Sequence, residues 1–503
     1  MRSKKALANI IISLTHHFVV VICGLIVPRL IISTFGSSVN GLISSITKFL
    51  GYIVLLEAGV GGVVRAALYK PLADKDIDSI SGIIKATERF FRIIGLTFLG
   101  YLLVLAVLFP FITSNVFGSF FTFSLVLIIG VSTFFQYYFG ISYQTLLQAD
   151  QRKYITNTIQ TFTMIINTVL VVILVKFGFG IHMVKLASAI IFILRPVFIY
   201  TYVNRKYGII KNVEPDNNAI KQRWDGLGHH IAYLLHYNTD IAVLTFFADI
   251  KEVSVYSVYY MVVSAIRQLM FTFSTGLEAA FGNMIAKNEK IALEKNFRIF
   301  EFSTFSLTTI LFTSTALLIL PFVSLYTSGV TDVNYYRPLF AYLLILAEAI
   351  YCLRIPYQSV VLAAGHYKET RNHAFIEAFI NVFLSVILVN KLGLVGVAIG
   401  TIVAMLFRTI HYAVYLSKNI LKRNIWVFIQ KIVVYSLITF VIVIIVNNMP
   451  SLLINSYASW IIYASIVTII TTIITISVGL LFYFEEAKNI YLILERLLRK
   501  RTE

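Results

Sequence analysis

The segment INTVLVVILV (166–175) recurs in the same chain as INVFLSVILV (380–389). Seven of the ten positions are identical, and the two copies lie 214 residues apart. At nearly the same offset, 213, Arg195 matches Arg408, and each arginine lies in the middle of an apolar run. Apolar segments resemble one another easily by chance, but a matched arginine inside them is a more specific signal. The pattern therefore indicates an internal duplication.

Apolar runs as long as one membrane crossing occupy most of the chain. Of its 503 residues, 58% are hydrophobic and 13% are charged, and the mean hydropathy is +0.83. Soluble globular proteins are closer to half apolar and a quarter charged. A helix needs roughly 20 apolar residues to cross the hydrocarbon core. We expect about fourteen membrane-spanning helices, near residues 8–33, 41–66, 89–112, 119–146, 155–176, 182–203, 229–249, 252–284, 299–326, 338–362, 373–391, 395–417, 425–447 and 457–484.

The repeat unit holds six of these runs. Because six is an even number, both copies enter the membrane in the same direction and are expected to be related by an axis along the membrane normal. The sequence thus predicts an all-α integral membrane protein with two pseudo-symmetric six-helix lobes and two further helices. The predicted parts are an N-terminal lobe (1–203), an inter-lobe linker (204–228), a C-terminal lobe (229–417), helices thirteen and fourteen (418–484) and a tail (485–503). A cavity between the lobes that opens alternately to each side would suit transport.

Positive residues predict the orientation in the membrane. Most of the 42 Lys and Arg residues lie in every second connection between the apolar runs, or near the ends of the chain. Such residues mark cytoplasmic loops, so both termini and the linker are predicted to lie on the cytoplasmic side of a cell membrane. Topology therefore accounts for the net charge of +18, which does not indicate a nucleic-acid partner. In the tail, Leu and Ile recur at helical spacing beside basic residues, which predicts an amphipathic helix on inner-leaflet lipids.

Ionisable side chains inside the predicted spans are candidate functional groups, because each costs at least about 2.5–3.5 kcal/mol to place in the hydrocarbon. A guanidinium keeps its charge and can donate two parallel hydrogen bonds to phosphate oxygens. Arginines in a water-filled cavity are therefore suited to a phosphorylated cargo. The arginines near the membrane midplane are Arg195, Arg267, Arg354 and Arg408. The acids at membrane depth are Glu57, Asp240, Glu278 and Glu348, which are candidates for binding H⁺ or Na⁺ as a coupling ion.

The same arginines have a second interpretation, as partners in structural ion pairs. Arg354 with Glu348, and Arg267 with Asp240, are examples of such pairs. Paired arginines would hold helices together, whereas arginines free of a partner would contact cargo. Both interpretations stay open on the sequence alone.

Other functional classes lack their sequence signals. No G-x-x-x-x-G-K-[ST] motif occurs, so the chain is not expected to use ATP. The two cysteines, Cys23 and Cys352, lie in separate apolar runs and predict neither a disulfide nor a metal site. A polysaccharide polymerase or ligase would carry a large outer loop, and the longest one here, 447–457, is short and uncharged. We therefore expect no enzyme activity, no catalytic residues and no cofactor beyond a coupling ion.

Three stretches near the N-terminus resemble the polysaccharide-type, Wzx-like flippases of the multidrug/oligosaccharidyl-lipid/polysaccharide exporter superfamily. They are VPRLIISTFGSSVNGL (27–42), LEAGVGGVVR (56–65) and YKPLA (69–73). The helix number, the charge pattern and the six-plus-six repeat extend this resemblance over the whole chain. It implies a MATE-like fold and the flipping of undecaprenyl-pyrophosphate-linked oligosaccharide repeat units from the inner to the outer leaflet.

The resemblance also implies a site and partners. Cavities in this family are typically cationic, which agrees with the four midplane arginines and adds Arg29 and Arg65 from the resembling stretches as candidates for cargo binding. The partners it implies are the lipid-linked oligosaccharide, membrane lipids, and a glycan polymerase or glycosyltransferases of the same pathway. Two alternatives stay open: a lipid II flippase of peptidoglycan synthesis, and an ion-coupled multidrug antiporter of the same superfamily. The antiporter would usually stop at twelve helices and favour an acidic cavity.

Overall fold

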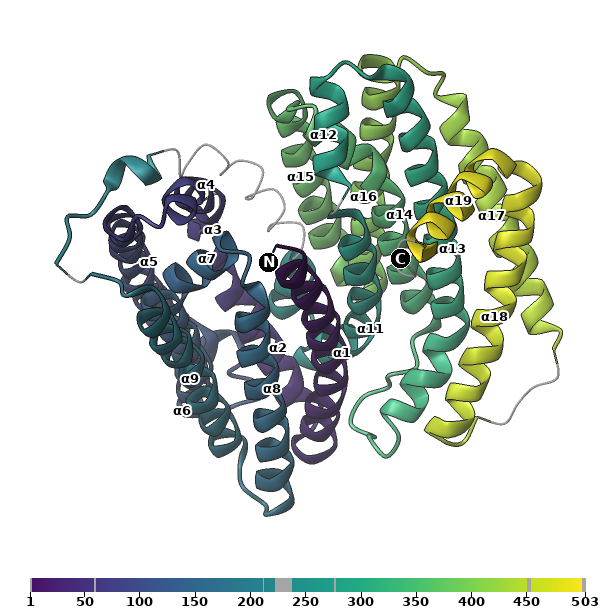
Figure 1. Ribbon diagram of the computed structural model, residues 1–503. Helices are drawn as coiled ribbons and strands as arrows, with labels where there is room; N and C mark the ends of the chain where they lie inside the picture. Colours follow the sequence, from purple (N-terminus) through teal and green to yellow (C-terminus); the bar gives the residue numbers. More distant parts are fainter. Residues whose placement is uncertain are drawn as a thin grey trace. The chain divides into compact units, whose positions relative to one another are not determined.

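A computed structural model of the chain describes residues 2–57, 60–210, 212–221, 238–275, 277–449 and 454–499. All regular elements in these ranges are helices (Figure 1). The helices form two compact units, Met1–Ser254 and Val255–Glu503. The predicted division into lobes around a linker at 204–228 stays a prediction.

The first unit contains seven long helices and several short ones. They are α1 (Arg2–Phe35), α2 (Ser37–Leu50), η1 (Gly51–Ile53), α3 (Val54–Glu57), α4 (Val60–Asp74), α5 (Ile77–Ile112), α6 (Ser119–Phe135), η2 (Gln136–Gly140), α7 (Ile141–Ala149), α8 (Lys153–Lys176), α9 (Ile181–Tyr207), η3 (Asn217–Ile220), a helix over 238–247, and the beginning of α11 (Ile250–Thr275). Gly36 and Gly208 have φ angles of 84° and 61°, and they separate α1 from α2 and end α9. Glycine adopts this backbone conformation without a steric penalty, which is why the helices stop there.

The second unit holds most of α11 and the helices that follow it. These are α12 (Glu278–Ala286), α13 (Lys290–Tyr326), α14 (Pro338–Ala363), α15 (Tyr367–Leu392), α16 (Leu394–Asn419), α17 (Trp426–Asn447), α18 (Tyr457–Phe482) and α19 (Phe484–Arg499). The last of them, α19, coincides with the predicted amphipathic tail and contacts α13 and α18. Its position on membrane lipids stays a prediction.

Twelve of the described helices are long and apolar enough to cross a membrane. They coincide with twelve of the fourteen predicted spans, and the chain is a multi-pass membrane protein. Of the other two, the span predicted at 229–249 begins on residues outside those described, and the one at 252–284 corresponds to α11 and α12. The run at 41–66 corresponds to the candidate span Ser37–Glu57 and to part of α4 (Val60–Asp74), and residues 58 and 59 lie outside those described.

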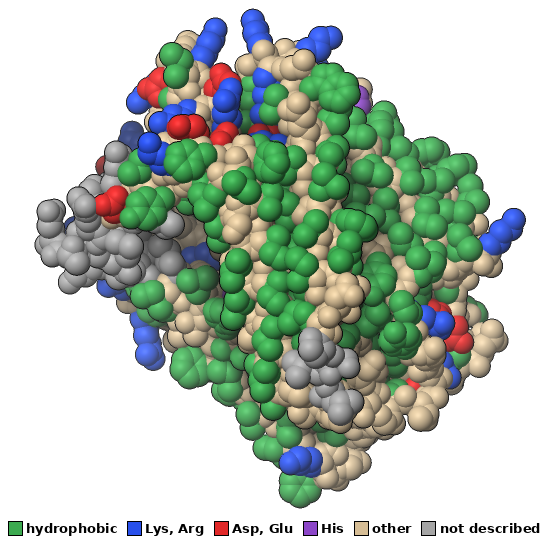
Figure 2. Space-filling view, turned by 90° about the vertical axis from the view of Figure 1, so that its right-hand side faces the viewer, with side chains coloured by type: hydrophobic (Ala, Val, Ile, Leu, Met, Phe, Trp, Pro, Cys, Tyr) green, Lys and Arg blue, Asp and Glu red, His purple; other side chains and the backbone are tan. Residues whose placement is uncertain are grey.

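The surface agrees with a lipid environment. On the face drawn in Figure 2, hydrophobic side chains cover most of the helices, and Lys and Arg gather mainly at one margin. Large apolar side chains such as Phe440, Ile462 and Ile469 are more than half exposed along α17 and α18. In water such a surface would favour aggregation, whereas in a bilayer it contacts acyl chains.

Close packing of α15 on α16 positions the charged groups described below. Gly396 and Gly400 lie one turn apart on α16, in the small-xxx-small spacing that lets two membrane helices approach closely. A Cβ atom on Gly396 would lie 2.5 Å from the carbonyl oxygen of Leu388, and one on Gly400 would lie 2.5 Å from Oγ of Ser385. Any larger residue at either position would therefore separate the two helices.

Candidate functional site

Arg267 and Glu348 form an ion pair between α11 and α14. Nη1 of Arg267 lies 2.6 Å from Oε1 of Glu348, and Nη2 donates a hydrogen bond of 3.0 Å to the hydroxyl of Tyr260. Both charged side chains are largely buried, at 12% and 5% exposure. Because both charges are largely shielded from water, each depends on close contact with the other. The pair therefore fixes how α11 and α14 face each other.

A second carboxylate, that of Glu377 on α15, lies between two arginines. Nη1 of Arg354 on α14 is 2.6 Å from Oε1 of Glu377, and Nε of Arg408 on α16 is 3.6 Å from Oε2. Arg408 also donates to the backbone oxygen of Thr370 at 2.8 Å and to the hydroxyl of Tyr412 at 2.9 Å. Three helices therefore meet around one buried acid.

The ring of Tyr351 connects these two groups into one arginine cluster, defined as Arg267, Arg354, Arg408, Glu348 and Glu377. Its centroid lies 6.0 Å from Cζ of Arg267 and 4.4 Å from Cζ of Arg354. Such distances are those of cation–π contacts. With three guanidiniums and two carboxylates in ionised form, the cluster carries one net positive charge inside the second unit.

Arg195 on α9 is the arginine of the first unit that was predicted to lie near the membrane midplane. Its Nε donates a hydrogen bond of 2.8 Å to Oγ1 of Thr163 on α8, and its guanidinium lies over the Phe192 ring at 4.1 Å. Its Nη2 atom is buried and has no hydrogen-bond partner among the described residues. No ion pair joins Arg195 to a described acid.

The remaining predicted site residues lie in other surroundings. Nη1 of Arg65 on α4 donates to Oε1 of Gln148 at 3.1 Å, and Glu57 at the end of α3 accepts a hydrogen bond of 3.1 Å from Tyr137. Arg29 is half-buried on α1, and Asp240 is buried in the helix over 238–247. Glu278 is the first residue of α12. None of these residues belongs to the arginine cluster.

Two ion pairs of the structure were not among the examples that the sequence suggested. Glu348 pairs with Arg267, and Arg354 pairs with Glu377. Sequence reasoning missed Glu377 although it lies inside the predicted span 373–391, where any acid is costly. That position in an apolar run was the signal that could have identified it.

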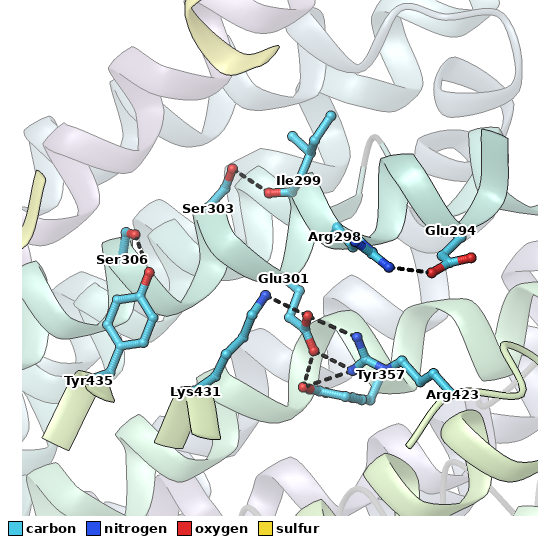
Figure 3. Close-up of polar contacts among 10 residues, drawn as sticks. All are labelled: Glu294, Arg298, Ile299, Glu301, Ser303, Ser306, Tyr357, Arg423, Lys431 and Tyr435. Carbon is cyan, nitrogen blue, oxygen red and sulfur yellow. Dashed lines mark hydrogen bonds and ion pairs between the residues drawn. The ribbon is translucent and has the colours of Figure 1, made fainter. Parts of the chain in front are cut away.

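A second buried network, also missed, surrounds Glu301 on α13 (Figure 3). Its carboxylate has no exposed surface and accepts hydrogen bonds from Arg423 at 2.5 and 3.0 Å, from Lys431 on α17 at 2.6 Å, and from the Tyr357 hydroxyl. Burial opposes the charge on Arg423, but the hydrogen bonds and charge of Glu301 outweigh it and raise the pKa of Arg423. The network joins α13, α14 and α17. It therefore holds α17, which corresponds to the predicted span 425–447, against its neighbours.

Solved membrane transporters resemble this arrangement of helices. The lipid II flippase MurJ in its inward closed conformation has a TM-score of 0.67 at 17% identity, and the match covers 95% of this chain and 99% of MurJ. An inward-facing multidrug resistance MATE family transporter of the MOP superfamily has a TM-score of 0.63 at 16% identity, covering 81% and 98%. The Vibrio cholerae MATE transporter VcmN has a TM-score of 0.56 at 17% identity, covering 83% and 98%.

The chain has the MurJ/MATE-like fold. This confirms the predicted fold class, including its MATE-like architecture. No protein-family model matches the chain, and no curated protein matches it either. At these identities the likeness is one of fold, so the function has to be argued from this chain's own residues.

Proposed function

We propose that this protein is a flippase that moves undecaprenyl-pyrophosphate-linked oligosaccharide repeat units from the inner to the outer leaflet by alternating access. The observation that carries this proposal is the unpaired guanidinium of Arg195, with its buried and unpartnered Nη2. An unpartnered cation at membrane depth is costly unless a ligand or water compensates it. A pyrophosphate is a suitable partner, because its oxygens accept the paired donors of a guanidinium.

The arginine cluster supports the same anionic cargo. Its net positive charge is inside a unit whose described helices span the membrane, where a cation has few other partners. Glu348 and Glu377 hold the arginines in place and leave one charge in excess. An acidic interior would have favoured the cationic drugs of a multidrug antiporter instead.

An apolar cavity near the cluster supports a lipid-linked cargo. It has a volume of about 720 Å³ and is lined by α13, α14, α16 and the α17 region, among them Leu353, Leu406 and Phe428. Thr409 also lines it and is the neighbour in sequence of Arg408. A cargo with a charged head and a long hydrocarbon chain would use both kinds of surface, whereas a soluble sugar phosphate would use only the charged one.

Lipid II flipping is the second candidate function. The match to MurJ covers 95% of this chain, against 81% and 83% for the two MATE transporters, so the chain's length favours a flippase over a twelve-helix antiporter. Lipid II and repeat-unit carriers are alike in their lipid and pyrophosphate. The sugars alone therefore separate the two proposals.

The coupling ion and the cellular setting are part of the proposal. Among the acids predicted to bind H⁺ or Na⁺, Glu348 is engaged with Arg267, whereas Glu57 contacts a neutral hydroxyl, that of Tyr137. Glu57 is therefore the acid we propose for coupling. We place the protein in the cell membrane with both termini cytoplasmic, working beside glycosyltransferases or a glycan polymerase.

Transport in proteoliposomes tests the proposal. Purified protein is reconstituted with a fluorescent undecaprenyl-pyrophosphate oligosaccharide, and an impermeant quencher measures how much reaches the opposite leaflet. We expect Arg195→Ala to lose transport at normal thermal stability and Arg195→Lys to recover it in part, because lysine keeps the charge but loses the fork. Arg205→Ala removes the same charge from an exposed site on the same helix and should have no effect.

Three outcomes of this assay would change the conclusion. Normal transport by Arg195→Ala and by alanine variants of all three cluster arginines would exclude a cationic cargo path. Transport of lipid II but not of other oligosaccharide carriers would favour the second function. Transport of cationic drugs without any lipid carrier would reject both.

A further inference from the structure

A cavity of about 950 Å³ lies in the first unit, away from the residues assigned to cargo. It is enclosed by the beginning of α5, by η2 and α7, by the end of α9 and by the chain that follows α9. Its lining includes Lys85, Glu88, Arg89, Arg92, Tyr143 and Tyr200. The proposed transport mechanism uses none of them.

Hydrogen bonds hold the chain after α9 against α5, so this rim of the cavity has a defined structure. The backbone N–H of Ile210 donates to the hydroxyl of Ser81 at 3.0 Å, and that of Asp216 donates to the carbonyl of Gly82 at 3.1 Å. A Cβ atom on Gly82 would lie 3.2 Å from the carbonyl oxygen of Glu214. Glycine thus permits the close approach that brings this segment over the start of α5.

The cavity has an excess of positive charge on one helix face. Lys85, Arg89 and Arg92 are spaced by four and three residues along α5, so their side chains share one side of the helix. The single acid among them, Glu88, accepts a hydrogen bond from Tyr143 and lies 3.8 Å from Arg92. No ion pair to a described residue engages Arg89. Among the side chains that line the cavity, three are cations and one, that of Glu88, is an anion.

Apolar side chains continue the same cavity along α5. Ile93 and Leu96 line it and are 59% and 57% exposed. The helix has 36 residues and is about 54 Å long at 1.5 Å per residue, against about 30 Å for the hydrocarbon core. The predicted span begins at residue 89, so the first turns of the helix are expected to lie outside the hydrocarbon. Lys85 lies in these turns, Arg89 and Arg92 lie at the beginning of the span, and Ile93 and Leu96 follow Arg92 by one and four residues.

We propose that this cavity binds a lipid with a phosphate head group, with the phosphate at Lys85, Arg89 and Arg92 and an acyl chain along Ile93 and Leu96. Basic pockets between membrane helices are suited to acidic head groups, and arginine pairs its donors with phosphate oxygens. The exposed apolar residues distinguish a lipid from a soluble phosphate, which would gain nothing from them. The phosphate lipid has two sources: an acidic membrane phospholipid, or the pyrophosphate carrier itself.

Lipid binding to the full-length protein in detergent, measured by native mass spectrometry, tests the site. The probes are phosphatidylglycerol, undecaprenyl pyrophosphate, phosphatidylcholine and inorganic pyrophosphate. We expect phosphatidylglycerol to bind and Arg89→Gln/Arg92→Gln to weaken it about tenfold or more, since each basic residue near a lipid surface contributes about 1 kcal/mol. Lys290→Gln/Lys295→Gln removes the same charge from exposed positions elsewhere and should leave binding unchanged.

Further binding measurements identify which phosphate lipid occupies the site and what the exposed apolar residues contribute. Tighter binding of undecaprenyl pyrophosphate than of phosphatidylglycerol would assign the site to the carrier, and the reverse order would assign it to a membrane phospholipid. Ile93→Ser/Leu96→Ser changes exposed side chains only and should weaken both lipids. The proposal is rejected if the arginine variant binds phosphatidylglycerol as the unmodified protein does, if phosphatidylcholine binds equally well, or if inorganic pyrophosphate competes as strongly as the lipids.

Discussion

The Nε atom of Arg195 donates a hydrogen bond of 2.8 Å to the hydroxyl of Thr163. In the second unit the Nε atom of Arg408 faces Oε2 of Glu377 at 3.6 Å. Thr163 and Glu377 are related by the same offset of 214 that aligns the two copies of the repeat. The helices of the predicted repeat thus place an arginine against the equivalent position in each unit, and the second unit has a carboxylate where the first has a hydroxyl.

Replacing Thr163 by glutamate should give the first unit the ion pair of the second. In Thr163→Glu, the new carboxylate would neutralise Arg195, so we expect transport of the pyrophosphate carrier to fall at least tenfold while the thermal midpoint is kept or raised. Thr163→Gln has the same size without the charge and is the control. Equal loss of transport in Thr163→Glu and Thr163→Gln would mean that side-chain volume matters there and charge does not.

Removing the carboxylate of Glu377 should destabilise the second unit strongly. Glu377→Gln leaves Arg354 and Arg408 buried without their counter-charge, and breaking a buried pair in this way costs roughly 3–5 kcal/mol. We expect a large drop in the thermal midpoint of the detergent-purified protein. Glu369→Gln changes an exposed acid on the same helix and should shift it little. Equal shifts in the two variants would show that the cluster is hydrated and weakly coupled.

Gly41 on α2 should tolerate no side chain. A Cβ atom there would lie 2.0 Å from the carbonyl oxygen of Ile250 at the start of α11, beside the hydrogen bond of 2.8 Å from Asn40 to Ser254. Gly41→Ala is therefore expected to cost about 1–3 kcal/mol through overpacking. Gly100→Ala on α5 meets nothing within 4 Å, and it should be neutral or slightly stabilising. The measurement is the thermal midpoint of each variant. Equal midpoints would contradict the close contact between Gly41 and Ile250.

The Glu301 network should show strong coupling between its members. Glu301→Gln leaves both Arg423 and Lys431 without a counter-charge, whereas Lys431→Met leaves Glu301 still paired with Arg423. We expect the first substitution to destabilise more than the second, and the double variant to lose less than their sum by about 0.5–3 kcal/mol. If the losses in the free energy of unfolding are additive in a double-mutant cycle, these residues do not act as one coupled network.

The predicted orientation can be tested at the two ends of α13. Asn288 precedes this helix and Ser328 follows it, and both are exposed. A cysteine at Ser328 should react with an impermeant reagent added to intact cells, and one at Asn288 should react only after the membrane is opened. The unmodified protein is the background control, because Cys23 and Cys352 are buried. The opposite labelling pattern would invert the topology.

The placement of most membrane helices and the fold class could be predicted from the amino-acid sequence. Twelve predicted spans reappear as helices, because crossing a bilayer requires a local run of apolar residues whose length depends on no other part of the chain. Arg195 and Arg408 could also be matched from the sequence, because corresponding residues of a repeat stay at a nearly constant offset along the chain. Changes of helix type inside a span, such as the π-helical η2 (Gln136–Gly140) within the predicted run 119–146, were less visible, because apolar character continues across them.

The pairing of acids with arginines could not be predicted from the sequence, because it depends on how the helices pack. Arg267 pairs with Glu348 across 81 residues and Arg354 with Glu377 across 23, and neither partner follows from sequence separation. Ion pairing depends on how each helix is rotated and how closely it packs, and here Gly396 and Gly400 bring α15 against α16. Apolar periodicity on helices surrounded by lipid and protein is too uniform to specify that rotation. The packing of neighbouring helices specifies it instead, and it places Arg195 beside the hydroxyl of Thr163 rather than beside a carboxylate.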